Sequence, residues 1–143
     1  MKKILLTLLF IVSTALSYGN THITIQFKNN DIFTYNFINT TGVTEHLFHF
    51  VTDPDEQWNA GLDHLPRLAE GEAIIGTNTL WEDKAAAEYQ AVLDLRQVFR
   101  SRGYRAEVWQ IYYYIDFFVG NWEQAVYFDK KDVIDVKIQN YSG

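Results

Sequence analysis

The sequence predicts an α+β fold in which an antiparallel sheet packs on one long amphipathic helix. Apolar residues recur at helical spacing over residues 80–102, which indicates a helix of that length. Segments with apolar residues at every second position lie before and after it, as in half-buried strands. Short turn-forming sequences join these segments, so we expect an N-terminal hairpin and a C-terminal three-strand meander in one domain over residues 20–143.

The N-terminal hairpin follows from alternation and turn chemistry. In residues 21–28, isoleucine and phenylalanine alternate with polar residues, which is typical of a half-buried strand. Residues 29–31, Asn-Asn-Asp, favour a turn. Residues 32–38 then continue as a second strand with three aromatic rings on one face.

A third strand and a short helix are predicted next. Residues 43–51 are apolar and β-branched enough for a strand, although a helical alternative stays open there. Asp53, Pro54 and Glu56 have the order of an N-cap, a first-turn proline and a capping acid. We therefore expect a short helix over residues 54–63.

The long helix has a predicted start and end. Residues 67–78, which contain glycines around a short apolar run, are predicted to be a loop. Thr79 and Glu82 match a capping box, and Gly103 stands where a helix ends. These signals place the helix at residues 80–102.

Three strands are predicted after the helix. Residues 105–115 are apolar on both faces, so we expect this strand to be central in the sheet. Residues 122–128 and 133–138 complete the meander, with turns at 116–121 and 129–132.

The first 19 residues have the pattern of a cleaved secretory signal. Lys2 and Lys3 precede an apolar stretch over residues 4–16, and small residues follow. This stretch is shorter than the roughly 20 apolar residues that span a bilayer. We therefore expect a secreted or periplasmic protein with no membrane span after signal removal.

The composition argues against several classes of function. The chain has no cysteine, and its only serines beyond the predicted signal are Ser101 and Ser142, so nucleophilic catalysis is not expected. Without Lys2 and Lys3, 10 basic residues remain against 18 acidic ones, and the net charge changes from −6 to about −8. This charge repels nucleic acid. No nucleotide-binding motif is present. We expect no cofactor.

Histidines and acids between residues 45 and 64 are the best candidates for chemistry. On a helix, His46 and His49 would share a face and could bind zinc together with nearby carboxylates. On a strand, they would point to opposite faces and could not share a metal ion. One alternative function is therefore a metal-dependent or carboxylate hydrolase. Its centre would be formed by His46, His49, Asp53 and Asp55, with Glu45 and His64 nearby in sequence.

A second metal hypothesis depends on signal cleavage. If the cut follows Gly19, His22 becomes the third residue of the mature chain. A free amine, two backbone nitrogens and an imidazole can then form a square-planar copper or nickel site. Alternatively, His22 is an ordinary surface residue at the start of a strand.

Aromatic residues concentrate between residues 109 and 122 and predict a binding surface. On a strand, Trp109 and Tyr113 share one face, and Tyr112 and Tyr114 share the other. Exposed tyrosine and tryptophan supply contact area at low entropic cost. Alternatively, the segment from residue 43 to residue 75 covers these rings. The predicted surface consists of Trp109, Tyr112, Tyr114, Phe117 and Trp122.

These features together predict a small exported binding protein rather than an enzyme. The expected partner is another protein, in the role of an inhibitor, an adaptor or a recognition factor. Carbohydrate binding by the same rings is an alternative, as is the hydrolase described above. The identity of the partner and the oligomeric state stay open at this point.

Overall fold

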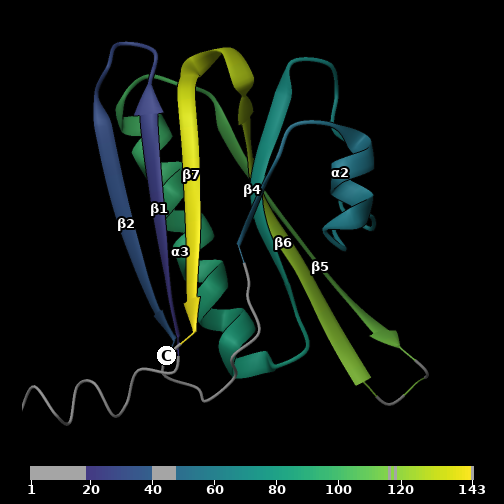
Figure 1. The fold of residues 1–143 in the computed structure, drawn as a ribbon. Coiled ribbons are helices and arrows are strands. Elements are labelled where there is room, and N and C mark those ends of the chain that lie inside the picture. The colour runs from purple at the N-terminus through teal and green to yellow at the C-terminus, as the bar shows by residue number, and fades with distance from the viewer. Residues whose placement is uncertain (1–18, 40–47, 116, 118, 143) are drawn as a thin grey trace, which may run out of the picture.

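The computed structural model of the protein describes residues 19–39, 48–115, 117 and 119–142. Over these residues, seven strands form two antiparallel sheets, accompanied by one long and one short helix. Figure 1 shows the long helix lying behind the strands labelled β2, β1 and β7. The predicted α+β class is confirmed. The predicted signal falls on residues that are almost all outside the described ones, so it stays a prediction.

The first sheet has the strand order β2-β1-β7. Its strands are β1 (Gly19–Phe27), β2 (Ile32–Asn39) and β7 (Val133–Ser142). The predicted N-terminal hairpin is confirmed. At its turn, Asn30 has a φ of 69°, and the Asp31 backbone N–H donates to Asn29 Oδ1 at 3.0 Å. Asparagine tolerates this left-handed conformation better than most residues, which explains the sharp turn.

The second sheet has the strand order β3-β4-β6-β5. Its strands are β3 (His49–Val51), β4 (Glu72–Thr79), β5 (Ala106–Ile115) and β6 (Val119–Asp129). β3 lies within the predicted third strand, and residues 40–47 are outside the described ones. The prediction of a loop over residues 67–78 was wrong, because most of that segment belongs to β4, one of the two inner strands of this sheet.

Gly76 explains why β4 did not resemble a strand in sequence. A Cβ atom at this position would lie 2.7 Å from the Ala125 Cβ and 2.8 Å from the Gln124 carbonyl oxygen of β6. The Leu62 side chain approaches the same position to 3.2 Å. Glycine is therefore required by close packing, and it does not break the strand here.

The long helix α3 (Glu82–Ser101) packs against strands of both sheets. Phe99 stacks on Phe128 of β6 with ring centroids 4.4 Å apart, and its ring meets Phe27 of β1 edge-on at 5.2 Å. Ile23 and Ile25 of β1 are fully buried in the same core. The two sheets therefore share one hydrophobic core with α3.

The ends of both helices differ from the predictions. α3 begins after Trp81, which makes no side-chain capping hydrogen bond, so the predicted capping box of Thr79 and Glu82 was wrong. Thr79 is instead the last residue of β4. The short helix α2 (Pro54–Asn59) begins at the predicted N-cap, where Asp53 Oδ1 accepts the Glu56 N–H at 2.9 Å. It ends earlier than the predicted residue 63.

The C-terminal strands do not form a three-strand meander. β5 and β6 form a hairpin, but the 3-10 turn η1 (Lys130–Asp132) directs β7 into the first sheet beside β1. β5 is an edge strand, and most of its residues are exposed, so its predicted central position was wrong. The apolar residues on its two faces led to the prediction of a buried strand, but most of them are exposed to solvent.

A second, smaller core lies on the face of the second sheet that points away from α3. α2 and the segment over residues 60–71 cover this face, and leucines of that segment pack on β4 and β6. The residues of this core are Val51, Leu62, Leu65, Leu68, Ile74, Ala125 and Tyr127. β4 and β6 are thus covered on both sides. Neither helix of the described residues has the length and apolar character needed to cross a membrane.

The inner side of α3 carries a buried charged pair. Lys84 and Glu88 are at most 1% exposed. The Thr77 hydroxyl donates to Glu88 Oε2 at 2.6 Å, and the Lys84 Nζ lies 3.9 Å from Glu88 Oε1. Burial raises the pKa of Glu88 to about 7, although the hydrogen bond from Thr77 and the charge of Lys84 oppose this shift.

Replacing Glu88 with glutamine should reduce the pH dependence of the free energy of unfolding between about pH 4.5 and 7. The unfolded carboxyl ionises near 4.5, whereas the folded one keeps its proton to about 7. The folded state binds more protons in this window, so its stability falls as the pH rises. At about 1.4 kcal/mol per pH unit, the wild-type protein should lose roughly 3 kcal/mol. Urea unfolding of both proteins at several pH values measures the difference, and parallel curves would contradict it.

The Gly76→Ala variant should be less stable than the wild type by about 1–3 kcal/mol, because the added Cβ overlaps β6. The double variant with Ala125→Gly removes one of the two closest contacts and should recover part of this loss. Urea unfolding of the single and double variants tests both statements. Strictly additive losses would argue against the proposed contact.

Candidate functional site

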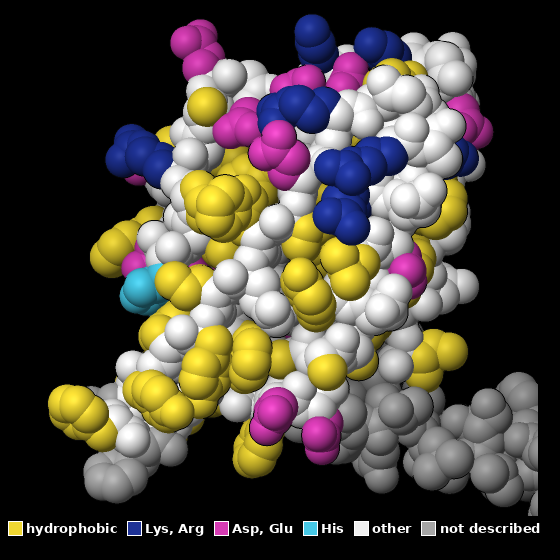
Figure 2. Space-filling view, turned by 180° about the vertical axis from the view of Figure 1, so that it is seen from behind, with side chains coloured by type: hydrophobic (Ala, Val, Ile, Leu, Met, Phe, Trp, Pro, Cys, Tyr) yellow, Lys and Arg dark blue, Asp and Glu magenta, His cyan; other side chains and the backbone are white. Residues whose placement is uncertain are grey.

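The β5–β6 hairpin projects from the body of the protein, at the lower right of Figure 1. Hydrophobic side chains gather along it, as Figure 2 shows from behind at the lower left. Among the described residues, more than half of the exposed large hydrophobic side chains lie on this hairpin. They are Trp109, Ile111, Tyr112, Tyr114, Ile115, Phe117 and Val119.

Three rings form a cluster on the face of the hairpin that continues the α3 side of the sheet. The Tyr112 ring lies 4.3 Å from Trp122 and 5.2 Å from Tyr114, measured between centroids. A Cβ at Gly120 would come within 2.7 Å of the Tyr112 ring, so this glycine leaves room for the ring. A hydrogen bond to Tyr114 raises the pKa of Tyr112. We call Tyr112, Tyr114 and Trp122 the aromatic cluster.

The predicted binding residues are mostly accessible. Tyr112 is 41% exposed and Tyr114 is 65% exposed, whereas Trp122 is partly buried beneath Tyr112. Trp109, 50% exposed, lies on the opposite face of β5. Phe117 at the tip is 91% exposed and has a φ of 67°, an uncommon conformation for a bulky residue. In the described part of the segment before β4, His64 stacks on Tyr113, whereas the rings of Tyr112 and Tyr114 stay exposed.

The outer edge of β5 pairs with no other strand of the described residues. β5 is ten residues long, and the eight residues from Val108 to Ile115 carry no charge. Every second N–H and C=O group of an edge strand points away from its sheet and can pair with another chain. The hairpin therefore offers backbone hydrogen bonds and aromatic rings at the same place.

A second group of polar side chains lies on the other face of the same sheet. Glu123 of β6 is fully buried, and its Oε1 accepts the His64 backbone N–H at 2.9 Å. Its Oε2 is in direct contact with His64 Nδ1, and Asp63 Oδ1 lies 3.6 Å from the same nitrogen. The His64 ring stacks on Tyr113 of β5 at 4.0 Å. We call Asp63, His64 and Glu123 the histidine cluster.

The segment that carries Asp63 and His64 is anchored by buried hydrogen bonds. The Gln57 side chain of α2 donates to the carbonyl oxygens of Leu62, Leu65 and Pro66, and accepts the backbone N–H of Leu68. The Tyr127 hydroxyl donates to the Pro66 carbonyl at 2.5 Å. These bonds fix the segment over β6, which explains how His64 reaches Glu123.

The histidines and acids of the sequence-based metal hypotheses do not meet in the described residues. Asp53 serves as the N-cap of α2. Among the residues that the structure describes, one group of at least three histidine, aspartate or glutamate side chains lies close enough together to share a metal ion. This group consists of Asp63, His64 and Glu123. His46 lies outside the described residues, so its pairing with His49 stays a prediction. Asp55 follows in the first turn of α2.

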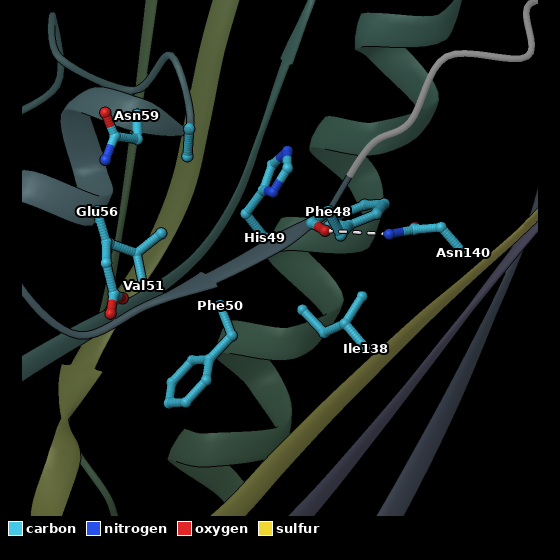
Figure 3. A pocket seen from close by; sticks show the side chains of 9 residues that line it. Phe48, His49, Phe50, Val51, Glu56, Asn59, Ile138 and Asn140 are labelled. Carbon is cyan, nitrogen blue, oxygen red and sulfur yellow. Dashed lines mark hydrogen bonds between the residues drawn. The ribbon is translucent and has the colours of Figure 1, made fainter.

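His49 and His22 lie on different sheets. His49 lies on β3 and lines a depression of about 580 Å³ between β3, α2 and β7. In Figure 3, the His49 ring extends from β3, and the Asn140 amide of β7 points to the Phe48 carbonyl. His22 lies on β1, in register with strands on both sides. The copper or nickel hypothesis for His22 depends on signal cleavage and stays a prediction.

The sequence analysis did not identify the histidine cluster. His64 was grouped with the histidines near it in sequence, but it contacts Glu123, which is 59 residues away. One signal was available, because Glu123 is the only charged residue between Trp122 and Phe128 in a strand that is otherwise polar or apolar. A lone carboxylate in a central strand needs a partner.

Replacing Gln57 with alanine should destabilise the protein by at least about 2 kcal/mol, because it removes the side-chain donor to the Leu62 and Leu65 carbonyls and the acceptor of the Leu68 N–H. Hydrogen exchange should speed up most in the segment over residues 60–71. Gln97 is exposed on α3, so Gln97→Ala serves as the control, with an expected change within about 0.5 kcal/mol. Equal effects of the two substitutions would show that Gln57 does not anchor the segment.

Comparison of the chain with protein-family models, with curated proteins and with solved structures finds no match. The functional argument therefore begins from the geometry of the β5–β6 hairpin and of the histidine cluster.

Proposed function

We propose that this protein is a small exported, non-catalytic binding protein that recognises another protein through the β5–β6 hairpin. The observation that carries the proposal is the uncharged edge of β5, which lies beside exposed aromatic rings. The basic and apolar start of the chain supports export to the periplasm or the outside of the cell.

The free edge of β5 supports recognition of an extended segment of the partner. An added strand would continue the second sheet beyond β5, with main-chain hydrogen bonds along its length. β2 is also an edge strand, but its rings Phe33, Tyr35 and Phe37 point into the core. The rings of β5 stay accessible and can contact the side chains of an added strand.

The aromatic cluster and Phe117 supply side-chain contacts. Tyrosine and tryptophan are rigid and amphipathic, so they lose little entropy on binding and often dominate interface energies. Exposed apolar patches of this kind on a soluble protein often mark interaction sites. Phe117 lies at the tip of the hairpin, and its ring is exposed to a partner.

Charge favours a partner segment with basic residues. The net charge of the chain is −6, and Glu82 lies near enough to Tyr112 to raise the pKa of its hydroxyl. Cationic side chains can also lie over tyrosine and tryptophan rings. We therefore propose that the recognised segment alternates apolar and basic residues.

The proposal predicts binding of an extended peptide in which valine and lysine alternate. Tyr114→Ala and Phe117→Ala should each weaken this binding about tenfold or more, measured by calorimetry. Both residues are largely exposed, so the variants should keep the wild-type thermal stability. Ile38→Ala, at an exposed residue of β2, an edge strand of the first sheet, is the matched control and should bind like the wild type.

Backbone pairing has its own test. The same peptide with N-methyl groups at every second residue should bind at least about tenfold more weakly in one of its two registers, because one row of donors is lost. Equal binding of both methylated peptides would exclude strand addition. Binding of glycans but not of peptides, abolished by Tyr114→Ala, would replace protein recognition by carbohydrate binding.

A further inference from the structure

The histidine cluster has the composition of a metal site. Asp63, His64 and Glu123 each offer one ligand atom, and these atoms lie within 4.8 Å of one another. We propose that the cluster binds a divalent transition-metal ion, with zinc as the representative ion. This proposal does not depend on the binding function of the β5–β6 hairpin.

The ligand types select the class of metal. One imidazole nitrogen and two carboxylate oxygens suit zinc and its neighbours, whereas calcium and magnesium prefer oxygen ligands alone. Three protein ligands leave further coordination positions for water or for a group of a bound molecule. The His64 side chain is 45% exposed, so the cluster can be reached from the surface.

The local charge favours a cation. Glu123 is fully buried, and in the described part of the chain neither it nor Asp63 forms an ion pair with a lysine or an arginine. Arg67 lines a small depression together with Asp63, without an ion pair between them. His64 can neutralise at most one of the two carboxylates, and only when protonated. A divalent ion would neutralise both, with His64 as a neutral ligand.

The cluster is held in place before any ion binds. The stacking of His64 on Tyr113 and the hydrogen bond from the His64 backbone to Glu123 Oε1 fix the imidazole and leave Glu123 Oε2 facing Nδ1. The Tyr113 hydroxyl also hydrogen-bonds to Glu123 and accepts a hydrogen bond from the Asn121 amide at 3.1 Å. Such outer contacts orient metal ligands in known sites.

The metal ion competes with a proton at this cluster. A proton between His64 Nδ1 and Glu123 Oε2 joins the two groups in the absence of metal. A metal ion bound by both atoms takes the place of that proton, which is released to the solvent.

The experiment is calorimetric titration of the purified protein with zinc at neutral pH. The wild type should bind one ion. His64→Ala and Glu123→Gln should lower the affinity at least about 100-fold, and Asp63→Asn about tenfold. His22→Ala and His49→Ala are matched controls and should bind zinc like the wild type. With cobalt in place of zinc, the visible absorption of the wild-type complex should disappear in His64→Ala.

Circular dichroism without metal identifies variants that fail to fold. Asp63 is exposed, so if the substitutions at His64 or Glu123 prevent folding, the zinc affinity of Asp63→Asn decides. Absence of binding at millimolar zinc would overturn the proposal. The proposal would also be overturned if the single variants Asp63→Asn and His64→Ala both bound zinc with wild-type affinity. Loss of zinc binding in His22→Ala or in His49→Ala would overturn it as well.

Discussion

The packing of Phe99 between the two sheets is the contact on which the rest of the structure depends. Its ring touches Phe128 of the second sheet and Phe27 of the first, so α3 joins two sheets that would otherwise each expose an apolar face. The amide of Gln124 donates to the Ala85 carbonyl near the start of α3. The hairpin continues past this level without a helix over it. The position of α3 therefore determines which rings are buried and which stay exposed.

The sequence predicted the helices and strands better than it predicted which strands lie next to each other. Alternation identified β1 and β2, and helical spacing identified α3, because each exposes one face and buries the other. Two predictions were wrong for related reasons: most of β4 was predicted to be a loop, and β5 was predicted to be a central strand. Gly76 interrupts the apolar pattern of a buried strand, whereas β5 is apolar at residues that contact solvent. Local patterns do not distinguish a strand buried on both faces from one exposed on both faces.

Of the two candidate sites, one could be predicted from the sequence and the other could not. The aromatic residues of β5 could be found from sequence because they lie together on one hairpin. The histidine cluster could not, because it depends on the route of the segment after α2. Gln57 fixes that route through carbonyl groups, which carry no signature in the side chains of Leu62 or Pro66. Contacts between distant segments are set by tertiary packing rather than by local preference.

The pairing of β1 with β7 has a consequence for the timing of folding. Ile23 lies opposite Ile138 in the register of the two strands, so the first sheet joins the beginning and the end of the described chain. During synthesis, β1 has only β2 as a neighbour in its sheet until β7 has left the ribosome. Until then, the core-facing side chains of β1 lack the neighbouring side chains of β7. The first sheet is therefore completed only after β7 has been synthesised, late relative to its other two strands.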